Sequence, residues 1–121
     1  MEYLRIEESR PFLKDITCTK AREIMSIAEG KETFHIIDAR SKSLFDNGHF
    51  MNAKLLDAFQ NDFEEQIKHL PKDHTYLVYC TAGVRSRIAV DLMKKSGFQK
   101  IYHLKYGILA CDLKSGEFIK N

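Results

Sequence analysis

The chain has 121 residues, of which 44% are hydrophobic and 30% charged, and this balance predicts one globular domain rather than a disordered chain. A net charge of +2 and a pI near 8.4 are too mild to indicate a nucleic-acid or membrane partner, although they are compatible with a small anionic substrate. No stretch of the sequence approaches the ~20 apolar residues of a membrane span.

Three cysteines, Cys18, Cys80 and Cys111, are odd in number and far apart, so no disulfide framework is expected. No cysteine or histidine cluster has the spacing of a zinc site. The N-terminal residues 1–8 include acidic side chains and lack the apolar core of a signal peptide. A reducing compartment, the cytoplasm, is therefore predicted, with Cys18 and Cys111 as inert thiols.

Helix and strand patterns alternate along the first half of the chain. Thr19 is placed to cap a helix that ends near Gly30. Apolar residues over 34–37 predict a short strand, residues 41–47 predict a short helix, and residues 53–56 predict a second strand.

The second half continues the alternation. Asn61 and Glu64 form a variant of the capping box, which predicts a helix behind them. Residues 75–79 contain the apolar run 76–79 and show no polar alternation, which predicts a strand that is covered on both faces. The remaining predicted elements are a helix from Ser86 to Gly97, a strand over residues 101–104 and a short helix near Gly107.

Strands that alternate with helices through short connections predict an α/β fold with a parallel sheet and helices on both faces. In such sheets, ligands bind beyond the carboxyl ends of the strands. Cys80 directly follows the strand 75–79, while Asp38 and Arg40 follow the strand 34–37. We therefore expect these two strand ends to form one site.

Cys80 begins a short loop between a strand end and a helix start, which is an arrangement suited to a thiolate. Backbone N–H groups of such a loop can converge on the sulfur, and the helix N-terminus adds about half a positive charge. A thiolate stabilised in this way is nucleophilic at neutral pH. Gly83 allows the loop to curl, and Thr81 and Ala82 keep its rim small. The alternative is a buried structural cysteine, but the glycine, arginine and helix start at fixed offsets favour the nucleophile.

Three charged residues are also expected to lie near this loop. Arg85 is placed either to hold a sulfonate oxygen of a substrate or to pair outward with a carboxylate, and both alternatives stay open. Asp38 and Arg40 are expected to support the loop rather than to perform chemistry.

Three motifs occur in order at characteristic spacing. They are Asp38-Ala39-Arg40 with Phe45, Gly48-His49-Phe50 and Asn52-Ala53; then Cys80-x-x-Gly83-x-Arg85-Ser86; then Gly97-Phe98 with Ile101, Leu104, Gly107 and Ile108. Through them the chain resembles a single-domain rhodanese, a rhodanese-like sulfurtransferase, over about residues 16–113. Tyr106 and Cys111 depart from the family pattern, where a glycine and a tryptophan are common, and they bear on pocket shape and donor preference.

The resemblance implies a single rhodanese-like domain over residues 1–121, with a core at about 16–113 and a five-stranded parallel sheet. It implies that Cys80 accepts a sulfane sulfur as a persulfide, from thiosulfate or from a persulfide-bearing protein, and passes it to a thiol or to cyanide. No metal or organic cofactor, nucleic acid or membrane is expected to take part. The predicted substrate-binding loop consists of Thr81, Ala82, Gly83, Val84, Arg85 and Ser86.

Two other functions remain as alternatives. A cysteine-dependent phosphatase or arsenate reductase also uses a loop that runs from cysteine to arginine, but its loop needs one residue more than the four, Thr81 to Val84, found here. The smaller ring suits one sulfur atom better than a phosphate. A non-catalytic rhodanese-like module that only binds a partner is the second alternative, although such modules often lack the cysteine.

Overall fold

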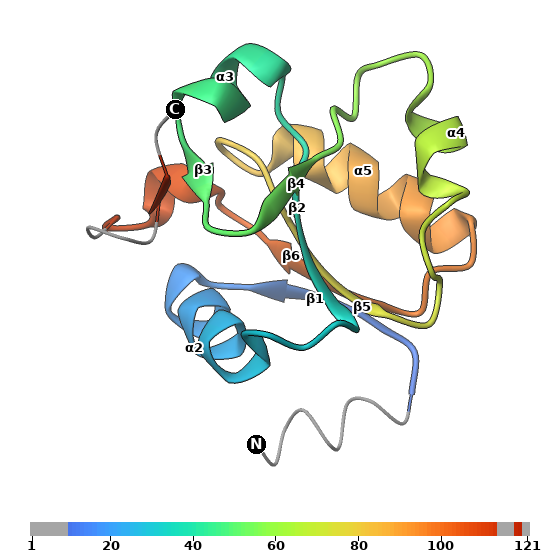
Figure 1. Cartoon of the computed structure of the whole chain (residues 1–121), viewed down its shortest axis with the longest axis horizontal. Coiled ribbons are helices and arrows are strands. Elements are labelled where there is room, and N and C mark those ends of the chain that lie inside the picture. Colours follow the sequence, from blue (N-terminus) through green and yellow to red (C-terminus); the bar gives the residue numbers. More distant parts are fainter. Residues whose placement is uncertain (1–9, 114–117, 120–121) are drawn as a thin grey trace.

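A computed structural model describes residues 10–113 and 118–119, so the N-terminal residues 1–8 used in the compartment prediction lie outside the described residues. Its central sheet has five parallel strands in the order β1-β6-β5-β2-β4 (Figure 1). These strands are β1 (Phe12–Ile16), β2 (Phe34–Asp38), β4 (Ala53–Leu55), β5 (Thr75–Tyr79) and β6 (Lys100–Leu104). Two short strands, β3 (His49–Phe50) and β7 (Phe118–Ile119), form a separate antiparallel pair.

Helices cover both faces of this sheet (Figure 1). One face carries α4 and α5, and the other carries α2. The helical elements are α2 (Cys18–Ala28), α3 (Lys42–Asn47), α4 (Phe63–Ile67), α5 (Val84–Lys95) and the 3₁₀ turn η1 (Ile108–Ala110). The predicted α/β fold, with a five-stranded parallel sheet between helices, is confirmed. Among the described residues, none of the helices combines the length and the apolar character that a membrane crossing requires.

Strand β5 is buried on both faces, as its unbroken apolar run predicts. Tyr76 and Val78 pack in the cluster beneath α4 and α5, whereas Leu77 and Tyr79 pack in the cluster beneath α2. All four side chains are 0% exposed. Because the strand is held by both layers, its carboxyl end, where Cys80 follows, is a rigid place for a functional group.

Several boundaries differ from the sequence predictions. The cap of α2 is Thr17 and not Thr19, since the Thr17 hydroxyl accepts a hydrogen bond from the Lys20 amide at 3.3 Å. The capping box at Asn61 does not form, because α4 starts after Asp62 without a side-chain cap bond. The edge strand β1 is absent from the predicted elements, because its half-exposed residues alternate poorly.

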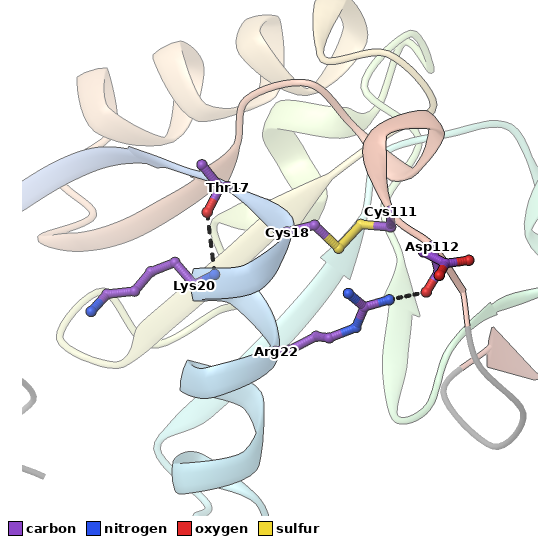
Figure 2. Close-up of a disulfide and its surroundings, with 6 residues drawn as sticks. All are labelled: Thr17, Cys18, Lys20, Arg22, Cys111 and Asp112. Atoms are coloured by element: carbon purple, nitrogen blue, oxygen red, sulfur yellow. Dashed lines mark hydrogen bonds between the residues drawn. A yellow bond between two sulfur atoms is a disulfide. The ribbon is translucent and has the colours of Figure 1, made fainter.

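The two cysteines that were expected to be inert thiols are joined in a disulfide, which corrects that prediction. Cys18 begins α2 and Cys111 follows η1, at a sequence separation of 93 (Figure 2). Arg22 of the same helix donates a hydrogen bond to the Asp112 carbonyl oxygen beside it. Their long separation hides the pair in the sequence, and β1 pairing with β6 brings the flanking segments together. Disulfides persist mainly in oxidising surroundings, so this bond does not support the predicted cytoplasmic location. That location stays a prediction.

Loss of this disulfide is expected to lower the free energy of unfolding by about 2–5 kcal/mol, because the bond closes a long loop and restricts the unfolded chain. The measurement is urea unfolding of the wild type with and without reductant. Reductant should leave the Cys18→Ser/Cys111→Ser variant unchanged, which serves as the matched control. Equal unfolding midpoints for the oxidised and reduced wild type would contradict a stabilising cross-link.

Candidate active site

Cys80 lies at the carboxyl end of β5, and the loop behind it enters α5 earlier than the sequence predicts. The helix begins at Val84 and not at Ser86, with Gly83 as its N-cap at φ 95°. A β-carbon built on Gly83 would lie 2.0 Å from the Lys105 carbonyl oxygen. Glycine is therefore required both by the left-handed conformation and by the close approach of the segment after β6.

Two backbone N–H donors and one hydroxyl group surround the Cys80 sulfur. The backbone N–H groups of Gly83 and Ser86 donate to Sγ at 3.1 and 3.3 Å, and the Ser86 hydroxyl oxygen lies 3.2 Å from it. Cys80 is only 3% exposed, so water screens these contacts little. Together with the N-terminus of α5, they form an environment in which negative charge on sulfur is stabilised.

A recess of about 180 Å³ lies over Cys80. Residues that follow β2 and β5, the two strand ends expected to form one site, both line it. It is lined by Arg40, Cys80, Thr81, Ala82, Val84 and Arg85. Asp38 does not line it. The recess holds room for a small sulfur donor, and two of the residues that line it, Arg40 and Arg85, are arginines.

Asp38 and Arg40 form a buried ion pair behind the recess. The Arg40 Nη2 group donates to Asp38 Oδ2 at 2.7 Å and to the Gly48 carbonyl oxygen at 2.6 Å. The Tyr79 hydroxyl also donates to Asp38 Oδ2, at 2.7 Å. Burial alone lowers the pKa of Arg40, but its hydrogen bonds and charge pairing with Asp38 outweigh burial and raise that pKa above its usual value. Arg40 therefore stays charged, and its hydrogen bonds to Asp38 and to the Gly48 carbonyl oxygen hold it in place at the recess.

Arg85 lines the recess and lies next to a carboxylate and an aromatic ring. Its Nε lies 3.7 Å from Asp57 Oδ1, and its guanidinium carbon lies 4.1 Å from the centroid of the Phe59 ring. The same Nε is buried and donates no hydrogen bond to any residue that the structure describes. Asp57 and Phe59 thus hold Arg85 at the recess, while its Nε–H group has no hydrogen-bond acceptor among the described residues.

The sequence analysis missed two residues that connect to the loop. The Ser86 hydroxyl lies 2.6 Å from His103 Nε2, and His103 Nδ1 lies 2.9 Å from Asp15 Oδ1. Arg87 donates a second hydrogen bond to that carboxylate. The pairing of β1 with β6 sets Asp15 directly beside His103. The sequence could have revealed this contact only if β1 had first been recognised as a strand.

The segment after β6 closes the site from the side. The Ile108 amide donates to the Cys80 carbonyl oxygen at 3.0 Å, and the Leu109 amide donates to the Thr81 carbonyl oxygen at 3.1 Å. The short helix predicted near Gly107 is the 3₁₀ turn η1. Its two amide hydrogen bonds hold the backbone of Cys80 and Thr81 in place.

A larger cavity, of about 560 Å³, lies between α2 and the β3 region and has a mixed lining that includes Phe34, Phe50 and Met51. It contains neither cysteine nor histidine. Within residues 10–113 and 118–119, no group of three or more His, Cys, Asp or Glu side chains is arranged to hold a metal ion. The chemistry-bearing residues are therefore those around Cys80.

The parallel sheet and the N–H-lined cysteine loop together define the class of α/β domains with the rhodanese fold. The family model described as the Rhodanese-like domain matches residues 20–112, which is more than half of the chain. The chain therefore belongs to the rhodanese-like domain family, and the resemblance found in its three motifs is confirmed.

Curated relatives combine this domain with additional sequence. The chain is 34% identical over 112 residues to the tRNA uridine(34) hydroxylase of Onion yellows phytoplasma, covering 88% of this chain and 36% of that protein. It is 34% identical over 89 residues to the probable adenylyltransferase/sulfurtransferase MoeZ of Mycobacterium tuberculosis, covering 74% of this chain and 23% of that protein. The chain thus spans about a third or less of these relatives' length.

Solved structures agree with the fold. A rhodanese-like domain protein from Staphylococcus aureus superposes with a TM-score of 0.72 at 25% identity, covering 89% of this chain and 99% of that one. A rhodanese with anions from E. coli superposes with a TM-score of 0.58 at 20% identity, covering 73% and 99%. The second likeness is evidence for the fold alone.

Proposed function

We propose that the protein is a sulfurtransferase of the thiosulfate or persulfide type, in which Cys80 carries the transferred sulfur. The observation that supports this most directly is the convergence of two backbone N–H donors and the Ser86 hydroxyl on a buried sulfur, at 3.1–3.3 Å. Such a ring stabilises the thiolate that attacks and also the anionic outer sulfur of a persulfide. The family membership and the sulfurtransferase name of the mycobacterial relative point in the same direction.

The proposed reaction has two steps and needs no external oxidant or reductant. The Cys80 thiolate attacks the outer sulfur of thiosulfate, the sulfur–sulfur bond of the donor breaks, and sulfite leaves with the bonding electron pair. An acceptor thiolate or cyanide then attacks the outer sulfur of the Cys80 persulfide. Cys80 leaves as a thiolate, which the same N–H donors stabilise again.

The donor that fits the recess is small and anionic, or is a persulfide presented on a protein. Arg40 and Arg85 line a volume of only about 180 Å³ above Cys80. Positive charge in that position favours thiosulfate or a persulfide anion. The proposal involves no metal, organic cofactor, nucleic acid or membrane.

The alternatives make different use of the same loop. A phosphatase or arsenate reductase requires a ring wide enough for a tetrahedral oxyanion, whereas here Gly83 and Ser86 both donate to one sulfur atom. A non-catalytic binding module has no need of a thiolate environment. The donors around Cys80 favour sulfur transfer over both.

The deciding experiment is incubation of the purified protein with thiosulfate, followed by intact mass measurement and peptide mapping. The expected result is a gain of one sulfur atom on Cys80, which dithiothreitol or cyanide removes. An unmodified protein, or sulfur mapped to Cys18 or Cys111, would contradict the proposal. Robust hydrolysis of an aryl phosphate by the wild type would favour the phosphatase alternative instead.

Replacement of Arg85 by alanine is expected to raise KM for thiosulfate and to lower kcat/KM by roughly 10- to 100-fold, because a charge-assisted hydrogen bond is lost. Arg85→Lys should recover only part of the loss, since a lysine lacks the planar fork. The check is steady-state kinetics with thiosulfate and with an uncharged persulfide donor, for which the loss should be much smaller. Equal losses with both donors would identify Arg85 as a brace for the loop through Asp57.

A further inference from the structure

Behind Cys80 lies a continuous chain of hydrogen-bonding groups that the sulfur-transfer proposal does not use. It runs from Cys80 Sγ to the Ser86 hydroxyl at 3.2 Å, then to His103 Nε2 at 2.6 Å, and from His103 Nδ1 to Asp15 Oδ1 at 2.9 Å. Ser86 is 0% exposed and His103 is 1% exposed. Buried polar side chains are costly unless they are fully satisfied, so their presence directly behind the nucleophile calls for a function.

We propose that Ser86, His103 and Asp15 form a proton relay that removes the thiol proton of Cys80 and holds it on His103. The S–H bond of Cys80 breaks as its proton passes to the Ser86 oxygen, and the Ser86 hydroxyl proton passes to His103 Nε2. No other reactant is required, since a thiol and a neutral imidazole become a thiolate and an imidazolium. This inference rests on the proposed function and assigns Ser86, His103 and Asp15 as positioning residues for it.

The hydrogen-bond geometry sets the direction of the relay. The Asp15 carboxylate accepts the Nδ1–H of His103, which leaves Nε2 as the acceptor for the Ser86 hydroxyl. When His103 becomes an imidazolium, its Nε2–H donates to Ser86 and the Ser86 hydroxyl turns to donate to the thiolate. The sulfur anion then receives three donors rather than two, because Gly83 and Ser86 also donate their backbone N–H groups.

The charged groups around His103 come from two elements. Asp15 lies beside it on β1, and Arg87 and Asp91 face it from α5. Burial, with help from Arg87, lowers the pKa of His103 although Asp15 and Asp91 oppose this, so His103 rests neutral. Burial raises the pKa of Asp15, but its hydrogen bonds to His103 and Arg87 outweigh burial and lower it, so its carboxylate remains charged.

The relay serves both half-reactions of the proposed cycle. In the first, Cys80 must be a thiolate to attack the donor sulfur. In the second, Cys80 is the leaving group, and leaving as a stabilised thiolate lowers the barrier. An imidazolium paired with Asp15 supplies the compensating positive charge in both.

The test is the pH dependence of Cys80 alkylation by iodoacetamide, followed by peptide mass spectrometry between about pH 5 and 10. His103→Gln keeps polar contacts to Ser86 and Asp15 but takes up no proton. It should move the pH of half-maximal alkylation upward by about 1–2 units, with an unchanged plateau at high pH, because one hydrogen bond to a charged group is lost. Asp15→Asn should give a shift in the same direction, and Ser86→Ala should match His103→Gln.

The matched control is His35→Gln, because His35 is a partly buried histidine bonded to His74 at 2.8 Å, outside the Cys80 loop. It should leave the alkylation profile unchanged. Coinciding midpoints for the wild type and His103→Gln, or a lower plateau without a shift, would overturn the relay. Alkylation needs no sulfur donor, so failure of the relay is distinguishable from failure of sulfur transfer.

A second measurement needs no change in the relay itself. The ¹⁵N resonances of His103 report whether Nε2 is protonated. In the wild type, Nε2 should carry a proton at pH values at which the ring of Cys80→Ser is neutral, because the thiolate of Cys80 forms by passing its proton to His103. Identical titration of His103 in both proteins would overturn the proposal.

Discussion

Replacement of Cys80 by serine is expected to abolish sulfur loading while leaving the fold intact. The hydroxyl is close in size to the thiol, and the N–H groups of Gly83 and Ser86 that now donate to sulfur can donate to the serine oxygen. The free energy of unfolding should therefore change by less than about 2 kcal/mol. Transfer from thiosulfate should fall on the order of 10⁴- to 10⁶-fold, as when the nucleophile of a concerted site is removed.

Two measurements check this prediction. Intact mass after incubation with thiosulfate should show a sulfur adduct in the wild type and none in Cys80→Ser, and urea unfolding should show that both proteins are folded. The Cys18→Ser/Cys111→Ser variant is the matched control, since it also changes cysteines but keeps the loop. Sulfur loading that survives in Cys80→Ser would exclude Cys80 as the carrier.

The sheet was largely predictable because its inner strands are buried on both faces. The strand 75–79 carries no charged residue and shows no polar alternation, and this alone predicts a strand that is covered on both faces. The edge strand β1 escaped prediction, since Lys14 and Asp15 are exposed and disturb its apolar pattern. An edge strand pairs with one neighbour only and is more exposed to solvent, so its sequence shows a weaker apolar pattern.

The site was predictable where it is local and unpredictable where it is not. Gly83, Arg85 and Ser86 follow Cys80 closely in the sequence, and their spacing alone indicates a loop that stabilises a thiolate. His103 and Asp15 are 88 residues apart and meet only through the pairing of β6 with β1. The Cys18–Cys111 disulfide, with a separation of 93, was missed for the same reason, because contacts between distant segments depend on the sheet topology.

Gly107 is the second position, after Gly83, at which the backbone conformation and a close approach both require glycine. It stands at φ 72° and ψ −175°, a region that only glycine adopts readily. A β-carbon built there would lie 2.1 Å from the Thr81 carbonyl oxygen and 2.6 Å from the Ala82 amide nitrogen. Both atoms belong to the loop that positions Cys80, so any side chain at residue 107 must displace that loop.

Gly107→Ala is therefore expected to lower the rate of sulfur loading by about 100-fold or more, since a displacement of about 1 Å at a reacting group costs that much. Gly30→Ala is the matched control, because Gly30 also has a positive φ, 83°, but a β-carbon there meets nothing within 4 Å. In the control, backbone strain should lower the free energy of unfolding by about 1–2 kcal/mol. Its rate of sulfur loading should stay unchanged. Single-turnover loading by thiosulfate and urea unfolding of both variants measure the two effects separately. If Gly107→Ala loads sulfur as fast as Gly30→Ala, the segment after β6 does not hold the loop in its reactive position.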